Sequence, residues 1–378
     1  MFLTKASSFL LLTGFVANVL GAANLYKIIY CNKPICLNKF NNLFGGEPQL
    51  YEQTFLAMED MSNIFLEDFE AGNESGTYGS LLVGGSFSSK AREFNVNTKG
   101  NAKCPSNMNN INTVGLFVQK QLEGTVDVRG TAFVPENAKV QVKEEGYKCH
   151  RDLSSKFSLE MNVLKYQANY ASRFFAIRNP TIVVGSDGGI SFPSDQTWNV
   201  NDFELWVYLF STCNNGDCNI HPGGMSDPSA ILEGKSAWNG FGGTFGAQVF
   251  DIYPGSTAVF NVPVTVGSTF TLGGSGSIAN GLPSCVSVLN IYPVDSQGRY
   301  TEGEITVKRE TDGDLDVVVL APQATVINGN KGGFGQQVIA KKYVGQGSGF
   351  GLKGNNGDSS TCKTFGACLP VHALREYF

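Results

Sequence analysis

The sequence has little charge and very little histidine. Charged residues make up 16% of the 378 residues, and only three are histidine. The net charge is −5 and no run of Lys or Arg occurs, which argues against nucleic acids and anionic membranes as partners. Because 42% of the residues are hydrophobic, the chain is nonetheless expected to fold around a core.

Recognisable catalytic motifs are also missing. The sequence contains neither the G-x-S-x-G nucleophile elbow nor the H-E-x-x-H zinc motif. His150 adjoins Cys149, but a cysteine expected in a disulfide is not a nucleophile. Residues 349–354 match G-x-G-x-x-G, yet a Gly-rich run follows where a dinucleotide site needs a helix. We therefore expect a protein that is not an enzyme and that uses no cofactor.

Long hydrophobic runs are confined to the N-terminus. Residues 9–20 are apolar but too short to span a bilayer, with Lys5 before them and small residues after them. This pattern predicts a signal peptide over residues 1–22. The C-terminal residues carry no hydrophobic tail, so neither a GPI anchor nor a C-terminal membrane span is expected. The predicted location is extracellular or at the cell wall, with no membrane span after signal removal.

The rest of the chain divides into three parts by composition. Residues 23–50 form a cysteine-bearing lead, residues 51–345 the main domain, and residues 346–378 a Gly-rich linker and a cysteine-bearing tail. Nine cysteines in a secreted chain predict disulfides, and the odd count leaves at least one thiol free or bonded between chains. Their spacing is not that of a zinc site, and Cys104, Cys149 and Cys285 stand apart. Three pairs each bracket a turn-sized segment, although the first and third could instead cross-pair: Cys31/Cys36, Cys213/Cys218 and Cys362/Cys368.

Two further candidate sites lie in turns. Asn73 begins the glycosylation acceptor Asn-Glu-Ser within a Gly-rich segment. Asp312, Asp314 and Asp316 alternate as calcium ligands often do. The segment does not fit an EF-hand, and the alternation fits equally well a charged turn that enters a strand.

Glycine is abundant, with 45 residues, and short runs of β-branched residues lie between the glycines. Residues 317–320 and 338–340 are apolar at consecutive positions, as in strands buried on both faces of a parallel sheet. The turn-rich residues 328–335 lie between them, and no helical period fits the intervening segment, so a loop is expected to join the two strands. Parallel strands joined by loops indicate a β-solenoid, so the predicted fold is mainly β with one or two packed α-helices.

Two segments have helical periodicity. Their apolar stripes are predicted to pack on a sheet face rather than to bind a partner helix. Residues 203–210 are apolar at nearly every position and predict a strand covered on both sides, although aromatic residues there could also stack on sugars. The stripes comprise Tyr51, Phe55, Met58, Ser62, Phe65 and Phe69, and Phe157, Met161, Leu164, Ala168, Ala171 and Phe175.

A set of ordered motifs resembles the choice-of-anchor A domain of secreted and surface proteins. The resemblance covers roughly residues 40–345, and it implies a surface protein more than any defined activity. Members of that family usually carry a surface anchor, and because none is expected here, covalent attachment to a surface is not expected either. The motifs are a glycine-rich opening strand at residues 76–87, asparagine-bearing strands at residues 259–266 and 288–293, the turn Leu320-Ala321-Pro322, the segment Asn328-Gly329-Asn330, and a closing strand at residues 337–341.

The resemblance and the composition together favour one function. We expect a secreted, non-catalytic surface or matrix protein that binds a cell-wall or matrix polymer or a surface protein. A secreted carbohydrate-active enzyme on a β-helix is one alternative, and acids clustered on one face would favour it. An ice-binding or lectin-like module is another, and a regular threonine face would favour ice. Only residues 264–272 hint at such a face.

Overall fold

The computed structural model describes the chain over most of residues 54–354. The described residues are 29–30, 54, 56–58, 60–100, 104, 111–143, 149–157, 159–184, 190–191, 193, 198–200, 203–213, 217–218, 256–273, 287–354 and 369–372. The fold in these ranges is mainly β, as the sequence predicts, and most strand pairs are parallel.

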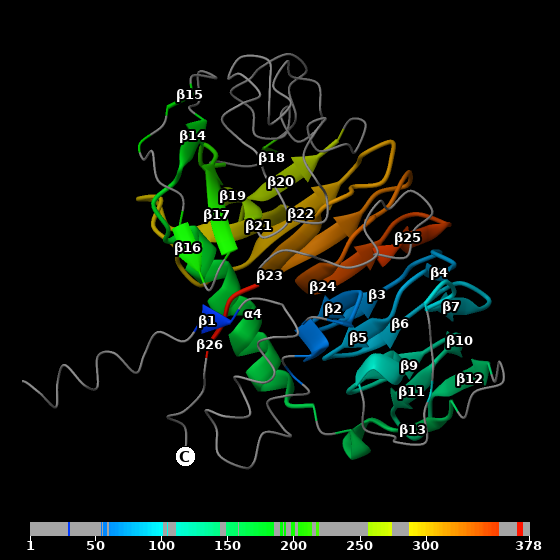
Figure 1. The fold of residues 1–378 in the computed structure, drawn as a ribbon. Coiled ribbons are helices and arrows are strands. Elements are labelled where there is room, and N and C mark those ends of the chain that lie inside the picture. Colours follow the sequence, from blue (N-terminus) through cyan, green and yellow to red (C-terminus); the bar gives the residue numbers. More distant parts are fainter. Residues whose placement is uncertain are drawn as a thin grey trace, which may run out of the picture.

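One parallel stack, which we call the first stack, runs the length of the molecule (Figure 1). Its neighbouring strands are, in spatial order, β13 (Arg151–Leu153), β11 (Thr131–Val134), β8 (Val114–Val118), β5 (Leu81–Val83), β2 (Asn63–Phe65), β24 (Val338–Gly345), β23 (Val318–Asn328), β21 (Ser287–Val294), β19 (Ser256–Thr265), β17 (Phe203–Leu209) and β14 (Ile182–Val184).

The second stack shares β23 and β24 with the first. Each of these strands pairs through its first residues in one stack and through its last residues in the other, with a register shift between them. The remaining strands of the second stack are β9 (Leu122–Glu123), β6 (Phe87–Ser88) and β3 (Phe69–Glu70) on the β24 side, and β22 (Ile305–Arg309), β20 (Thr269–Leu272) and β18 (Asp217–Cys218) on the β23 side.

The third stack is a separate parallel sheet. Bridges of Phe334 to Leu352 and to Leu315 extend it past its last strand. Its strands are β12 (Lys139–Lys143), β10 (Thr125–Arg129), β7 (Phe94–Val96), β4 (Gly76–Thr77) and β25 (Phe350–Leu352). The short elements outside the three stacks are β15 (Ile190–Ser191) and β16 (Trp198–Val200), the antiparallel pair β1 (Ile29–Tyr30) and β26 (Val371–His372), and the 3-10 turns η1 (Ile111–Thr113) and η2 (Ser154–Lys156).

The strand order places the two ends of the main domain side by side in the middle of the first stack. The chain builds outward from β2 to β13, and helix α4 (Met161–Ala176) follows. The strands after α4 begin at the opposite end with β14 and return until β24 pairs with β2. In Figure 1 the blue N-terminal strands therefore adjoin the orange C-terminal strands. We call the β2–β24 junction the seam.

Two apolar cores flank the first stack. One collects the inward side chains of all three stacks, including Phe65, Phe87 and Val126. The other lies between the first stack and α4, and includes Leu164, Ile339 and Leu320. The two apolar runs of residues 317–320 and 338–340 are fully buried, as predicted, because core lies on both sides of them. The strand over residues 203–210 likewise buries Leu205, Val207 and Tyr208.

Helix α4 packs on the first stack through the predicted stripe. Leu164, Ala168, Ala171 and Phe175 are fully buried, and the helix contacts β23, β21 and β19 (Figure 1). The stripe expected to start at Phe157 enters the helix only at Met161.

Buried asparagines fasten the helix to the sheet. Asn261 and Asn290 are paired in register on β19 and β21, and Asn290 Nδ2 donates to Asn261 Oδ1 at 2.8 Å. Asn261 Nδ2 also donates to the Phe175 carbonyl at 2.8 Å, while Ser172 Oγ donates to Asn290 Oδ1 at 2.8 Å. These two asparagines, one in each of the asparagine-bearing strands noted in the sequence, therefore provide hydrogen-bond partners for buried polar groups between the helix and the sheet.

The other predicted helical stripe is wrong from Ser62 onward, while its residues Tyr51 and Phe55 lie outside the described residues. Residues 54, 56–58 and 60 are helical, but Phe65 lies in β2 and Phe69 in β3. Both rings point into the same core from two different stacks. A corner of three residues separates them, and this gives the spacing of one helical turn without a helix.

Within the described residues, no helix is both long and apolar enough to cross a membrane.

Candidate functional site

The outer face of the second stack presents two regular rows of side chains. Residues alternate along each strand, so Phe270, Val307 and Val326 enter the core while their neighbours face outward. Thr269, Thr306 and Thr325 are paired in register on β20, β22 and β23, and all three are partly exposed. Adjacent parallel strands lie about 4.8 Å apart, so these hydroxyl and methyl groups repeat at that interval. We call them the threonine row.

The second row is more mixed. In register order it carries Thr271, which is buried, and then Lys308, Ile327, Val344 and Glu70, across five adjacent strands. Lys308 is neutralised by Glu310, with 2.5 Å between Nζ and Oε1. This face therefore offers hydroxyl and apolar groups rather than a field of one charge.

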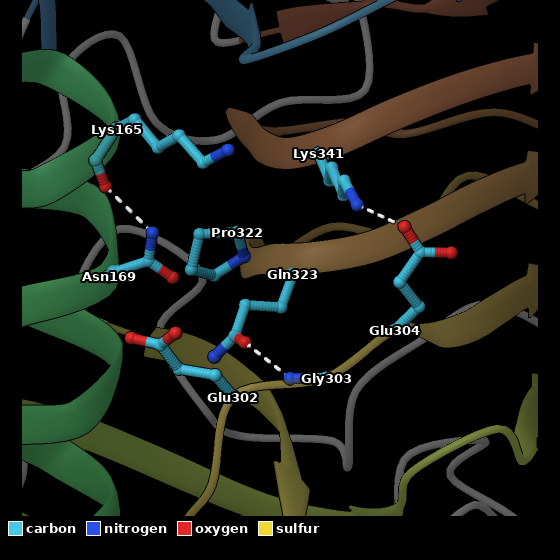
Figure 2. Close-up of a pocket in the computed structure, with 8 residues that line it drawn as sticks. All are labelled: Lys165, Asn169, Glu302, Gly303, Glu304, Pro322, Gln323 and Lys341. Atoms are coloured by element: carbon cyan, nitrogen blue, oxygen red, sulfur yellow. Dashed lines mark hydrogen bonds and ion pairs between the residues drawn. The ribbon is translucent and has the colours of Figure 1, made fainter. Parts of the chain in front are cut away.

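A pocket of about 240 Å³ lies beside this face, between α4 and the turns that join the first and second stacks (Figure 2). Lys165 and Asn169 line it from the helix. Pro322 and Gln323 line it from the middle of β23, and Lys341 from the middle of β24. The remaining lining residues precede β22 and are Glu302, Gly303 and Glu304.

Hydrogen bonds hold the pocket walls in place. Gln323 Oε1 accepts from the Gly303 amide and its Nε2 donates to the Tyr300 hydroxyl, both at 2.9 Å. Burial raises the pKa of Tyr300 to about 12, so that hydroxyl keeps its proton at neutral pH. Asn169 Nδ2 donates to the Lys165 carbonyl at 2.9 Å. The amide side chains are thus positioned before any ligand arrives.

The pocket charges are balanced. Lys341 forms an ion pair and hydrogen bond with Glu304, which lowers the pKa of that carboxyl. Glu67 lies near the ammonium groups of Lys165, Lys341 and Lys342, at 3.4, 3.8 and 3.6 Å. Two lysines and two glutamates line the cavity itself, so the pocket has donors and acceptors but no formal excess of charge.

A buried charged network lies away from the pocket, where the second stack turns towards the third. The carboxylate of Glu74 accepts from Asn328 Nδ2 at 2.7 Å and from the Tyr343 hydroxyl at 2.9 Å. Arg309 is fully buried, donates to Asn328 Oδ1 and to Thr311, and attracts Glu74 electrostatically. Burial outweighs these partners and raises the pKa of Glu74 to about 7. The partners of Glu74 come from β22, β23 and β24, so the group joins three neighbouring strands.

The structure does not bring the calcium candidates together. Asp312 pairs with Lys331 at 2.8 Å, Asp314 with Lys353 at 2.7 Å, and Asp316 accepts from Gln336 at 2.6 Å. Among the described residues, no three His, Cys, Asp or Glu side chains are grouped as a metal site would need. The alternation instead belongs to the turn before β23.

The structure contains a disulfide that the spacing of the cysteines did not suggest. Cys104 bonds to Cys149, with 5.0 Å between their Cα atoms. Residues far apart in sequence become neighbours when strands stack in parallel, so a disulfide of this kind cannot be inferred from spacing. Cys213 is also disulfide-bonded. Its predicted pairing with Cys218 stays a prediction, since the Cys218 side chain lies outside the described set, as do Cys31, Cys36, Cys362 and Cys368.

Asn73 is exposed, as a glycosylation acceptor has to be, whereas the adjacent Glu74 is buried. Residues 350–352 of the G-x-G-x-x-G match form β25, not the turn into a helix that a dinucleotide needs.

Comparison with known protein families assigns the chain to a family. A family model described as "Putative Ice-binding-like adhesive domain" matches residues 56–352, well over half of the sequence. The chain belongs to this family. The resemblance to surface proteins therefore holds at the level of an adhesive domain, and the choice-of-anchor A assignment in particular is not shown. No curated protein and no solved structure matches the chain. Membership in the ice-binding-like adhesive family supports a role in adhesion at surfaces.

The threonine row is the feature that sequence reasoning missed most clearly. Thr269 lies in the segment noted as a hint, but Thr306 and Thr325 follow at unequal intervals because the intervening turns differ in length. Register between parallel strands, not a sequence period, puts the three in line.

Proposed function

We propose that this chain is a secreted, non-catalytic adhesive protein that binds a cell-wall or matrix polymer through the outer face of the second stack. The observation that carries the proposal is the match of residues 56–352 to the ice-binding-like adhesive family. The face supplies a means of binding, because its hydroxyl groups and apolar patches recur at one interval and can meet successive units of a polymer.

The proposal includes a finer description of the fold as a β-solenoid. From β2 to β3 to β4, and again from β5 to β6 to β7, the chain visits the first, second and third stacks in turn. Inward side chains of all three stacks share one core, as expected for the sides of a coil. The second stack would then be one side of a prism, with the threonine row along it.

Retention on isolated cell-wall or matrix material tests this function. The wild-type protein should be retained in moderate salt, because the face relies little on charge, and no new reducing ends should appear. Thr306→Tyr at the centre of the threonine row should reduce retention several-fold by holding the polymer off the face. Thr125→Tyr makes the same change at a partly exposed position of the third stack and should not.

Two results would contradict the proposal. Equal retention of the two variants would show that the outer face of the second stack is not the binding surface. Turnover of a polysaccharide that a single Asp→Asn change abolishes would favour the carbohydrate-active enzyme.

Ice binding is a second candidate, and the in-register threonine row favours it. The row spans three strands and then meets Lys342, so it is short. Thermal hysteresis by the wild-type protein, lost in Thr306→Tyr but not in Thr125→Tyr, would favour ice over a polymer.

A further inference from the structure

The pocket between α4 and the stack corners has features that the polymer-binding face does not need. It is concave, it lies at a corner rather than on the face, and a helix from another part of the chain closes one side (Figure 2). Its volume of about 240 Å³ is below the roughly 300 Å³ at which pockets for drug-sized ligands begin. It therefore has room for one small unit.

The lining selects a neutral polar ligand. Lys165 and Lys341 present ammonium donors, and Glu302 and Glu304 present carboxylate acceptors. Because the formal charges cancel, an anion would meet the two carboxylates and a cation would meet the two ammonium groups. A ligand that both donates and accepts at several closely spaced positions avoids both conflicts.

The apolar part of the lining is a single ring. Pro322 lies between the polar side chains that line the pocket in Figure 2. Pro322 is buried except where it lines the pocket. That part of its pyrrolidine ring can pack against C–H groups of a ligand while the surrounding polar groups take its hydroxyls. A polar rim around a small apolar surface matches a pyranose ring, whose faces are C–H groups and whose edge is hydroxyls.

We propose that this pocket binds one neutral hexose unit, with Lys341 and Lys165 donating to its hydroxyl groups and Pro322 packing on its ring. The site is separate from the outer face of the second stack and does not depend on it. A free hexose and the terminal unit of a glycan chain present the same chemistry to the pocket, and free sugar is the simpler probe.

Titration of the intact protein with a panel of free sugars tests the site. Glucose, mannose, galactose and N-acetylglucosamine are added separately, and gluconate serves as an anion of similar size. Saturation-transfer NMR measures binding. The expected result is saturable binding of at least one neutral hexose and weaker binding of gluconate.

Variants locate the binding. Lys341→Met and Lys165→Met keep the length of the side chain, remove the ammonium group, and should each weaken hexose binding by roughly tenfold, as for a lost charge-assisted hydrogen bond. Lys156→Met is the matched control, because Lys156 is also paired with a carboxylate, that of Asp152, but lies on η2, outside both the pocket and the outer face of the second stack. Lys165 is exposed on α4, so its variant should fold even if the half-buried Lys341 variant does not.

The possible results distinguish a hexose site in the pocket from binding elsewhere on the protein. Absence of binding by all four sugars, tighter binding of gluconate, or an equal loss in Lys156→Met would each overturn the proposal. Hexose binding that survives in Thr306→Tyr, together with lost polymer retention, would show that the pocket and the face act independently.

Discussion

At the scale of single residues, Glu74 is the side chain whose ionisation the fold affects most clearly. It is buried against Asn328 and Tyr343, and its pKa is raised from 4.5 to about 7. The folded protein therefore holds a proton on this group at pH values where the unfolded chain has released it. The stabilising effect is complete below about pH 4.5, declines as the pH rises to about 7, and is absent above that.

Glu74→Gln is predicted to flatten this pH dependence. The shift corresponds to about 3 kcal/mol between pH 4.5 and pH 7. The amide cannot ionise but keeps a carbonyl for Asn328, so the variant should be at least as stable as wild type at pH 8. Urea unfolding at a series of pH values measures the effect. Glu70→Gln, at an exposed position, should leave the profile unchanged, and an unaltered profile in Glu74→Gln would contradict the assignment.

The same scale shows where sequence is a weak guide. Asp312, Asp314 and Asp316 alternate in the chain, yet each meets a different partner, because the partners come from neighbouring turns. The Cys104–Cys149 bond links residues that are 45 positions apart. Contacts of this kind depend on which strands stack together, and local spacing does not contain that information.

At the scale of elements, α4 depends on its buried stripe. Leu164→Asp is predicted to unfold the protein or stop its secretion, because it places an unpaired charge among fully buried side chains. The expected loss is more than about 4 kcal/mol. Thermal unfolding and the secreted yield measure it.

Asn162→Asp adds the same charge to an exposed position of the same helix and is the control. Normal secretion and equal stability of both variants would show that the stripe does not carry the packing of α4.

Short strands were predictable because their sequence signals are local. Residues 318–320 and 338–340 are recognisable as strands from their apolar, β-branched composition, and they open β23 and β24. The stripe through Phe65 and Phe69 was misread because a β corner can reproduce helical spacing. The parallel pairing of β23 with β24 could be predicted, because apolar residues at consecutive positions indicate strands that are buried on both faces. The threonine row could not be predicted, because it depends on the register between strands, which the sequence does not give directly.

At the scale of the whole molecule, the seam joins segments that are distant in sequence. Gln337 Nε2 donates to the carbonyls of Met58 and Met61 at 2.8 and 2.7 Å, across separations of 279 and 276 residues. The residue is buried, so no solvent would replace these bonds.

Gln337→Leu is predicted to destabilise the protein by about 2 kcal/mol or more, because it keeps the side-chain size but leaves two buried acceptors unpaired. The midpoint of urea unfolding measures this. Gln297→Leu, at an exposed turn, should change stability little. Equal midpoints for the two variants would mean that the seam is not held by this side chain.

The position of the seam also sets an order of events during synthesis. Strand β2 is made early, but one of its two neighbours, β24, does not exist until residue 345 has left the ribosome. Until then β2 has an unpaired edge, which invites pairing with other chains. Contacts across such long loops form slowly. The earliest part of the domain to be synthesised is thus among the last to be completed.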